Sequence, residues 1–151
     1  MKLLALVLVL FGASCGGIDA PSTLHYPGQD EAKALADAQF VADGYDDTGI
    51  VFSLWYRTDD NCLPDPWNFG GTIDPEITVT LDDHHCRWGR TLYMVWWSIV
   101  AVVIRGDGSI ADTSFAHELG HVAKFDPWHD HRPLWDTTIP TINATLREAG
   151  L

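Results

Sequence analysis

The chain has 151 residues, 46% of them hydrophobic and 20% charged, so it is long enough for one globular domain with a buried core. Its 21 acidic and 9 basic side chains give a formal net charge of −12. Because the basic residues form no run or stripe, the composition argues against nucleic acid as a partner.

The N-terminal residues predict an export signal rather than part of the fold. Lys2 precedes an uninterrupted apolar run, Leu3 to Phe11, and small residues then lead to Cys15. Such a run is too short for a permanent transmembrane helix and is typical of a secretion signal. Small residues directly before a cysteine resemble the bacterial lipobox, which implies a lipid anchor on Cys15. The alternative is ordinary signal cleavage followed by secretion.

These observations predict three regions in the chain. Residues 1–14 form the signal peptide, residues 15–29 the lipidated cysteine and a tether, and residues 30–151 one folded domain. The protein would then be exported to the cell envelope, on its periplasmic side or at the cell surface, and would contact the membrane only through its lipid.

The first regular elements follow the tether. Residues 30–42 have helical spacing, with Asp30 as cap and an apolar face at Ala34, Leu35, Ala38 and Val41. Residues 50–57 are rich in β-branched and aromatic side chains and predict a strand. Residues 77–81 alternate strictly between apolar and polar side chains and predict another.

The two remaining cysteines, Cys62 and Cys86, are an even pair in an exported chain. They predict one disulfide, which would constrain the unfolded chain. The alternative is that Cys86 binds metal together with the adjacent His84 and His85.

The second half of the domain begins with an almost continuously apolar segment. Residues 92–104 predict a buried strand, or a helix end followed by a strand, with Trp96 and Trp97 in the core. After a turn at 105–108, Ser109 or Asp112 is expected to cap a helix that ends before Pro127. A last helix is expected over residues 140–149.

The helix expected after residue 112 carries the sequence His117-Glu118-Leu119-Gly120-His121, an H-E-x-x-H motif. Its two histidines lie about 40° apart around the helix axis, so both imidazoles leave one face and can bind one zinc ion. Glu118 lies about 100° from His117, where it can reach a water on that metal and act as general base.

This motif resembles that of the zincin metallopeptidases. The resemblance implies a small α+β domain in which a mixed sheet packs on the active-site helix and on a C-terminal helix. It further implies Zn²⁺ as cofactor, a peptide or protein as substrate, and hydrolysis by a metal-bound water that Glu118 activates. A strand before the helix, near residues 102–105, would pair with an extended substrate.

A catalytic zinc usually has three protein ligands, so one more is expected after the helix. The metzincin spacing would place it at residue 127, which is a proline, and no methionine follows the motif for a metzincin methionine turn. His131 is the preferred third ligand because its distance from the helix lets the chain turn back. His129 and Asp126 are the alternates. Trp128 and Trp135 flank these candidates, either as core residues or packed over the site.

Two kinds of function therefore remain after the sequence alone. The first is a zinc-dependent metalloendopeptidase. Glu118 distinguishes it from the second, since only catalysis needs a base at this position. The second is a non-enzymatic surface lipoprotein whose histidines bind zinc for structure or storage.

Overall fold

The computed structural model describes residues 21, 23–57, 62–63, 78–81, 84–87, 89–93, 96–104 and 108–151. The signal peptide, Cys15, residues 16–20 and 22 of the tether and residues 105–107 of the predicted turn lie outside these ranges and stay predictions.

The described elements are helices and short strands. The helices are α2 (Gln29–Ala42), α3 (Phe115–Ala123) and α4 (Ile139–Glu148), with a 3₁₀ turn η1 (Ile110–Asp112) and a π-helical turn η2 (Leu134–Thr138). The strands are β1 (Val51–Tyr56), β2 (Thr78–Leu81), β3 (His84–Arg87), β4 (Gly89–Tyr93) and β5 (Ser98–Val103).

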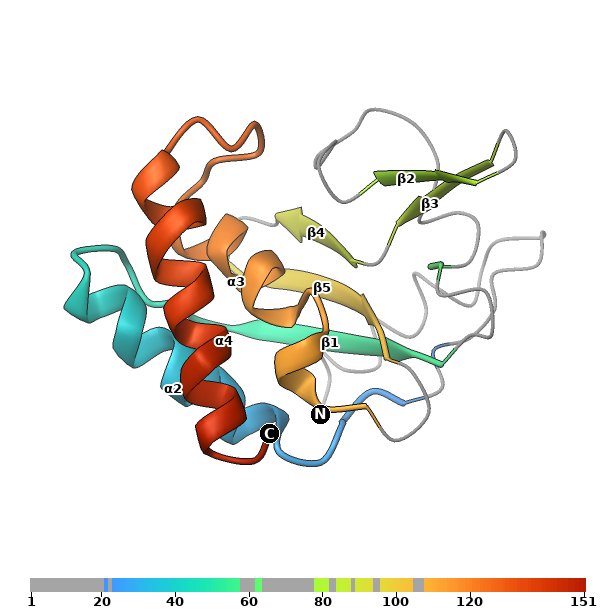
Figure 1. Cartoon of the computed structure of the whole chain (residues 1–151), viewed down its shortest axis with the longest axis horizontal. Helices are drawn as coiled ribbons and strands as arrows, with labels where there is room; N and C mark the ends of the chain where they lie inside the picture. The colour runs from blue at the N-terminus through green and yellow to red at the C-terminus, as the bar shows by residue number, and fades with distance from the viewer. Residues whose placement is uncertain are drawn as a thin grey trace.

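The main sheet is mixed, with the strand order β1-β5-β4. β5 runs parallel to β1 and antiparallel to β4, and β2 and β3 form a separate antiparallel pair. Helices α2, α3 and α4 cover one face of the main sheet (Figure 1). The predicted α+β class is therefore confirmed.

Alternation along the strands divides the core into two layers. Trp55, Val100 and Val102 face the helices, whereas Leu54 and Ala101 belong to a second cluster on the opposite face. All six residues of β5 are buried, because a central strand covered on both faces needs apolar side chains in both directions.

The predicted helix over residues 30–42 is confirmed, but its predicted face is wrong. The buried side chains of α2 are Ala32, Ala36 and Phe40, whereas Val41 is 57% exposed. Phe40 is the largest apolar side chain of the helix, so its burial sets the rotation of the whole element.

The apolar segment over residues 92–104 contains parts of two strands and no helix end among its described residues. It runs from the end of β4 into β5, and the expected core position of Trp96 is wrong, because this side chain is 82% exposed. Trp97 is partly buried against the second cluster. An apolar run by itself does not reveal a chain reversal, which explains the error.

The helix that carries the motif starts later than expected. Ser109 and Asp112 flank or belong to η1, and the N-cap of α3 is Ser114. The helix ends at Ala123, three residues before the predicted stop at Asp126.

The last helix is confirmed as α4, which continues directly from η2. Pro140, near its start, has no N–H to continue the α-helical hydrogen bonds, and this favours the wider π turn just before it. Within the described part of the chain, no helix is both long enough and apolar enough to cross a membrane.

Candidate metal centre

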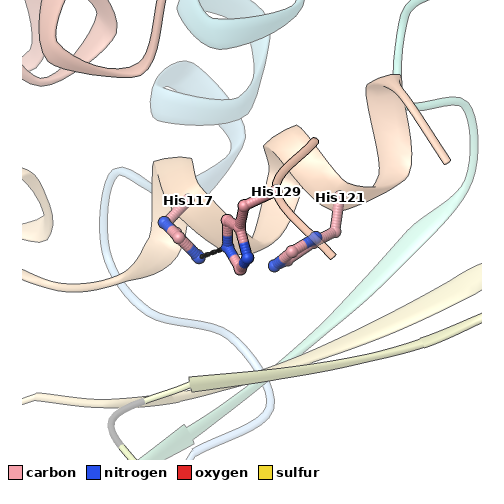
Figure 2. A group of neighbouring side chains, drawn as sticks. All are labelled: His117, His121 and His129. Carbon is pink, nitrogen blue, oxygen red and sulfur yellow. Dashed lines mark hydrogen bonds between the residues drawn. The ribbon is translucent and has the colours of Figure 1, made fainter. Parts of the chain in front are cut away.

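Three histidines meet beside α3, as Figure 2 shows. His117 and His121 come from the helix and His129 from the loop that follows it. The three candidate ligand atoms all lie within 4.8 Å of one another, and Nε2 of His117 is 3.0 Å from Nε2 of His129. The structure therefore brings together three imidazole nitrogens that could hold one metal ion.

A main-chain carbonyl orients the imidazole of His121. Its Nδ1 lies 3.0 Å from the carbonyl oxygen of Asp126, and the side chain is 0% exposed. A carbonyl oxygen can only accept, so Nδ1 carries the proton and Nε2 keeps its lone pair. This is the usual arrangement for a histidine that ligates metal through Nε2.

His129 reaches the cluster because its backbone takes an unusual conformation. Its φ is 58°, the only positive φ of a non-glycine residue in the described chain. Histidine is among the residues that occupy this left-handed region more often than most, but the conformation still costs free energy. The local turn directs the side chain back toward α3, only eight residues after His121.

Asp126 holds that turn and is not part of the histidine cluster. Its Oδ1 accepts the backbone N–H of Asp130 at 3.0 Å, and its Oδ2 accepts the N–H groups of His131 and of the Trp135 indole, each at 2.8 Å. Burial alone would raise the pKa of Asp126, but these hydrogen bonds and the nearby His129 hold it below its ordinary value. The carboxylate thus supports the loop instead of offering itself as a ligand.

His131, the expected third ligand, lies elsewhere. Its Nε2 is 3.1 Å from the Tyr45 hydroxyl, and the two rings meet edge to face with centroids 5.5 Å apart. His129 therefore replaces His131 in the group that could bind metal. Spacing along the chain favours His131, but it does not reveal the left-handed turn at residue 129 that brings His129 to the cluster instead.

The carboxylate of Glu118 is fully buried between α3 and the edge strand β4. Its Oε2 accepts a hydrogen bond of 2.5 Å from the Thr91 hydroxyl, which is also 3.1 Å from the Glu118 carbonyl oxygen. Gly89 makes room for it, because a Cβ at that position would lie 2.5 Å from Oε1. Sequence analysis missed Thr91 and Gly89, since β4 has no clear periodic pattern.

The two tryptophans near the loop differ in their surroundings. Trp128 is 62% exposed, while the partly buried Trp135 packs against all three histidine rings. Tyr93 also contributes, by donating from its hydroxyl to the carbonyl oxygen of His121 at 2.9 Å.

The donor set suits a borderline-soft divalent cation. Imidazole nitrogens are favoured by zinc, copper, iron and nickel, and three of them leave a fourth position open in a tetrahedral site. Two nitrogens at ordinary zinc distances in a tetrahedron are about 3.3 Å apart, so the 3.0 Å separation of His117 and His129 needs only a small adjustment.

Cys62 is disulfide-bonded, whereas the side chain of Cys86 lies outside the described part of the structure. The pairing of Cys62 with Cys86 therefore stays a prediction.

Comparison of the chain with protein-family models, with curated proteins and with solved structures finds no match. Any functional conclusion rests on the sequence and on this geometry.

Proposed function

We propose that this protein is a zinc-dependent metalloendopeptidase in which Glu118 activates the attacking water. The observation that carries the proposal is the group of three histidines, His117, His121 and His129, beside a glutamate of the same helix. Export, and a lipid anchor on Cys15, belong to the same proposal and rest on the sequence alone.

A zinc ion held by the three imidazoles would polarise the scissile carbonyl and lower the pKa of a bound water. The other steps depend on side chains and main-chain groups of the protein. Glu118 takes the proton from the attacking water on its carboxylate and returns it to the leaving nitrogen. Thr91 holds Oε2 of Glu118 in place, and Asp126 keeps His121 in the tautomer that a metal ligand needs.

The substrate would lie along β4 rather than along the strand expected from the sequence. β5, which contains residues 102 and 103, is paired on both sides and has no edge to offer. Among the described strands of the main sheet, β4 pairs only with β5, and it also carries Thr91 next to Glu118. An extended peptide could add to its outer edge by main-chain hydrogen bonds.

Glu118→Gln tests the proposed mechanism. The amide keeps the shape of the side chain but cannot accept the proton, so we expect about one bound zinc and loss of cleavage by at least about 100-fold. Zinc content is measured by elemental analysis, and cleavage with an unfolded protein substrate. Equal cleavage by the variant and the parent would falsify the mechanism.

The ligand set has a separate test in two matched alanine variants. His129→Ala removes one of the three clustered nitrogens, and we expect zinc affinity to fall by orders of magnitude. His131→Ala removes a ring that contacts Tyr45, and zinc affinity is expected to stay within a few-fold of the parent. If His131→Ala instead lost more zinc affinity than His129→Ala, His131 would be the third ligand.

The second candidate is a non-enzymatic surface lipoprotein with a structural or storage zinc. The burial of the site favours it, since Glu118 and His121 are 0% exposed and His129 is 2% exposed. A zinc-binding parent that cleaves no unfolded protein substrate would support this function over peptidase activity.

A further inference from the structure

The indole of Trp135 contacts every histidine of the candidate metal centre. Its ring centroid lies 4.8 Å from that of His117, 4.7 Å from that of His121 and 4.4 Å from that of His129. The interplanar angles are between 39° and 56°, so the indole packs obliquely on all three rings. In the described structure, the three histidines also contact one another, which makes the four rings one packed group.

Trp135 is held in this place from two directions. Its Nε1 donates to Oδ2 of Asp126 at 2.8 Å, the carboxylate that also holds the loop of His129. On its other side the six-membered ring lies over Gly120, where a Cβ would be 3.1 Å from the nearest ring carbon. The residue belongs to the π-helical turn η2, a kind of turn that often occurs at functional sites.

Trp135 lies on the opposite side of the histidines from Glu118. On a helical wheel Gly120, which the indole covers, lies about 80° to one side of the mean direction of His117 and His121. Glu118 lies about 80° to the other side, where it meets β4. The indole therefore covers one flank of the three histidines, and the buried carboxylate of Glu118 with β4 lies on the other flank.

We propose that Trp135 is a positioning residue of the metal centre. Packed on three imidazoles and tied to Asp126, it fixes the ring orientations before the metal binds. Ligands that are already ordered lose less conformational entropy on binding, so the indole raises metal affinity without touching the ion. This inference rests on the proposed metal site, though not on peptidase activity.

Trp135→Phe is the variant that tests the proposal, with Trp128→Phe as its matched control. Both remove one indole from the same region, but Trp128 is 62% exposed and touches none of the three rings in the described contacts. Zinc affinity is measured by competition with a chelator, and tryptophan emission is followed in the same titration.

We expect Trp135→Phe to weaken zinc binding by about 10–100-fold, the usual effect of losing a partner that orients metal ligands. Zinc should change the tryptophan emission of the parent and of Trp128→Phe, and this change should be absent in Trp135→Phe. Unchanged zinc affinity in Trp135→Phe overturns the inference, whatever its emission does. A parent that binds no zinc overturns the proposed function together with this inference. If the parent has peptidase activity and Trp135→Phe binds zinc as tightly as the parent, only the inference is overturned.

Asp126→Asn provides a second variant if Trp135→Phe folds poorly. The amide keeps the main-chain carbonyl that accepts from His121 but weakens the acceptor of the indole N–H. We expect its zinc affinity to fall as well, together with a lower melting temperature of the metal-free protein, because an NH2 group cannot accept one of the hydrogen bonds that Asp126 accepts. A large loss of stability in the metal-free protein with unchanged zinc affinity would show that Trp135 and Asp126 have a purely structural role.

Discussion

The side chains that decide the chemistry of the site lie partly outside the motif. His117, Glu118 and His121 lie within five residues of sequence, but Glu118 and His121 are each oriented by a group from elsewhere in the chain. The carbonyl of Asp126 sets the tautomer of His121, and the hydroxyl of Thr91 holds Glu118. In the proposed mechanism Glu118 must lie within hydrogen-bond reach of the proton that it takes, so the groups that orient it would matter as well.

Thr91→Val tests this orientation of Glu118. The substitution keeps the volume but removes the hydroxyl that donates to Oε2, so the carboxylate can leave its position. A misplacement of about 1 Å can cost about 100-fold in rate, and we expect kcat to fall by about 10–100-fold with zinc affinity unchanged. Thr91→Ser restores the donor and should recover most of the activity.

Steady-state kinetics with zinc-loaded enzyme measure the Thr91 variants. A Thr91→Val enzyme with the kcat of the parent, or a Thr91→Ser enzyme as slow as Thr91→Val, would contradict a role for this hydroxyl. Loss of a buried hydrogen-bond partner also destabilises the fold by about 1–3 kcal/mol, so the assays should be run well below the melting temperature.

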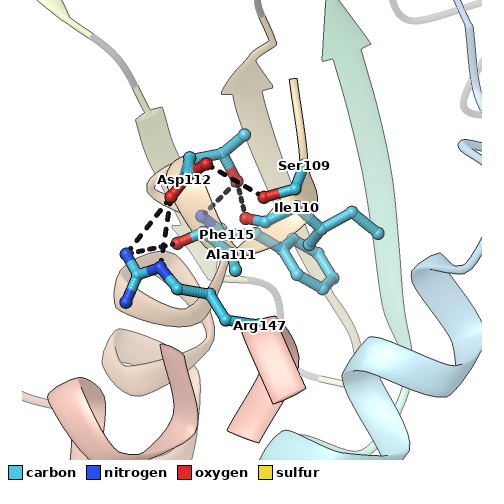
Figure 3. A network of polar contacts seen from close by, with 7 residues as sticks. Ser109, Ile110, Ala111, Asp112, Phe115 and Arg147 are labelled. Atoms are coloured by element: carbon cyan, nitrogen blue, oxygen red, sulfur yellow. Dashed lines mark hydrogen bonds and ion pairs between the residues drawn. The ribbon is translucent and has the colours of Figure 1, made fainter. Parts of the chain in front are cut away.

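Helix α4 is joined to the rest of the domain by an exposed ion pair and by a buried apolar face, which we expect to contribute unequally to stability. Figure 3 shows Arg147 reaching Asp112 of η1, with N–O distances of 3.2 and 3.3 Å, and the carbonyl of Ala111. This pair is more than half exposed, at 57% and 64%. The apolar side of the helix, with Ile142 and Leu146, is buried in the core.

Leu146→Ala and Arg147→Ala separate these two contributions. The first opens a cavity beside α2 and α3 and is expected to cost about 2–5 kcal/mol of unfolding free energy. The second removes an exposed ion pair and is expected to cost less than about 1 kcal/mol. Urea unfolding measures both, and a larger loss for Arg147→Ala would assign the anchoring of α4 to the network of Figure 3.

The predictions that held for the elements are those with a strong local cause. The helix at α2, the strand at β1 and the helix at α4 follow from spacing, β-branched composition and length. The rotation of α2 about its axis was not predicted correctly. Several apolar faces fit the same sequence, and only contact with the rest of the core selects the face with Phe40. β4 was missed since its five residues include glycine and arginine and show no alternation.

At the level of the whole molecule, the fold assembles the site from segments that are far apart in sequence. The strand order places β4 at an edge beside α3, which brings Thr91 to Glu118 across 27 residues of chain. The turn η2 brings Trp135 back onto α3 through the space that Gly120 leaves. The sheet and the helices on its one face thus form the frame, and the loop after α3 completes the centre (Figure 1).

The sequence by itself determined the helix of the motif and the pairing of His117 with His121 on one face, because these depend on local spacing, and the resemblance of the motif to that of the zincins implied the α+β class. Only the tertiary structure decided that His129 and not His131 joins them, that Trp135 packs on all three rings, and that Thr91 holds Glu118. Each of these depends on a backbone turn or on the order of strands in the sheet. Both arise from packing between distant segments, which no short stretch of sequence encodes.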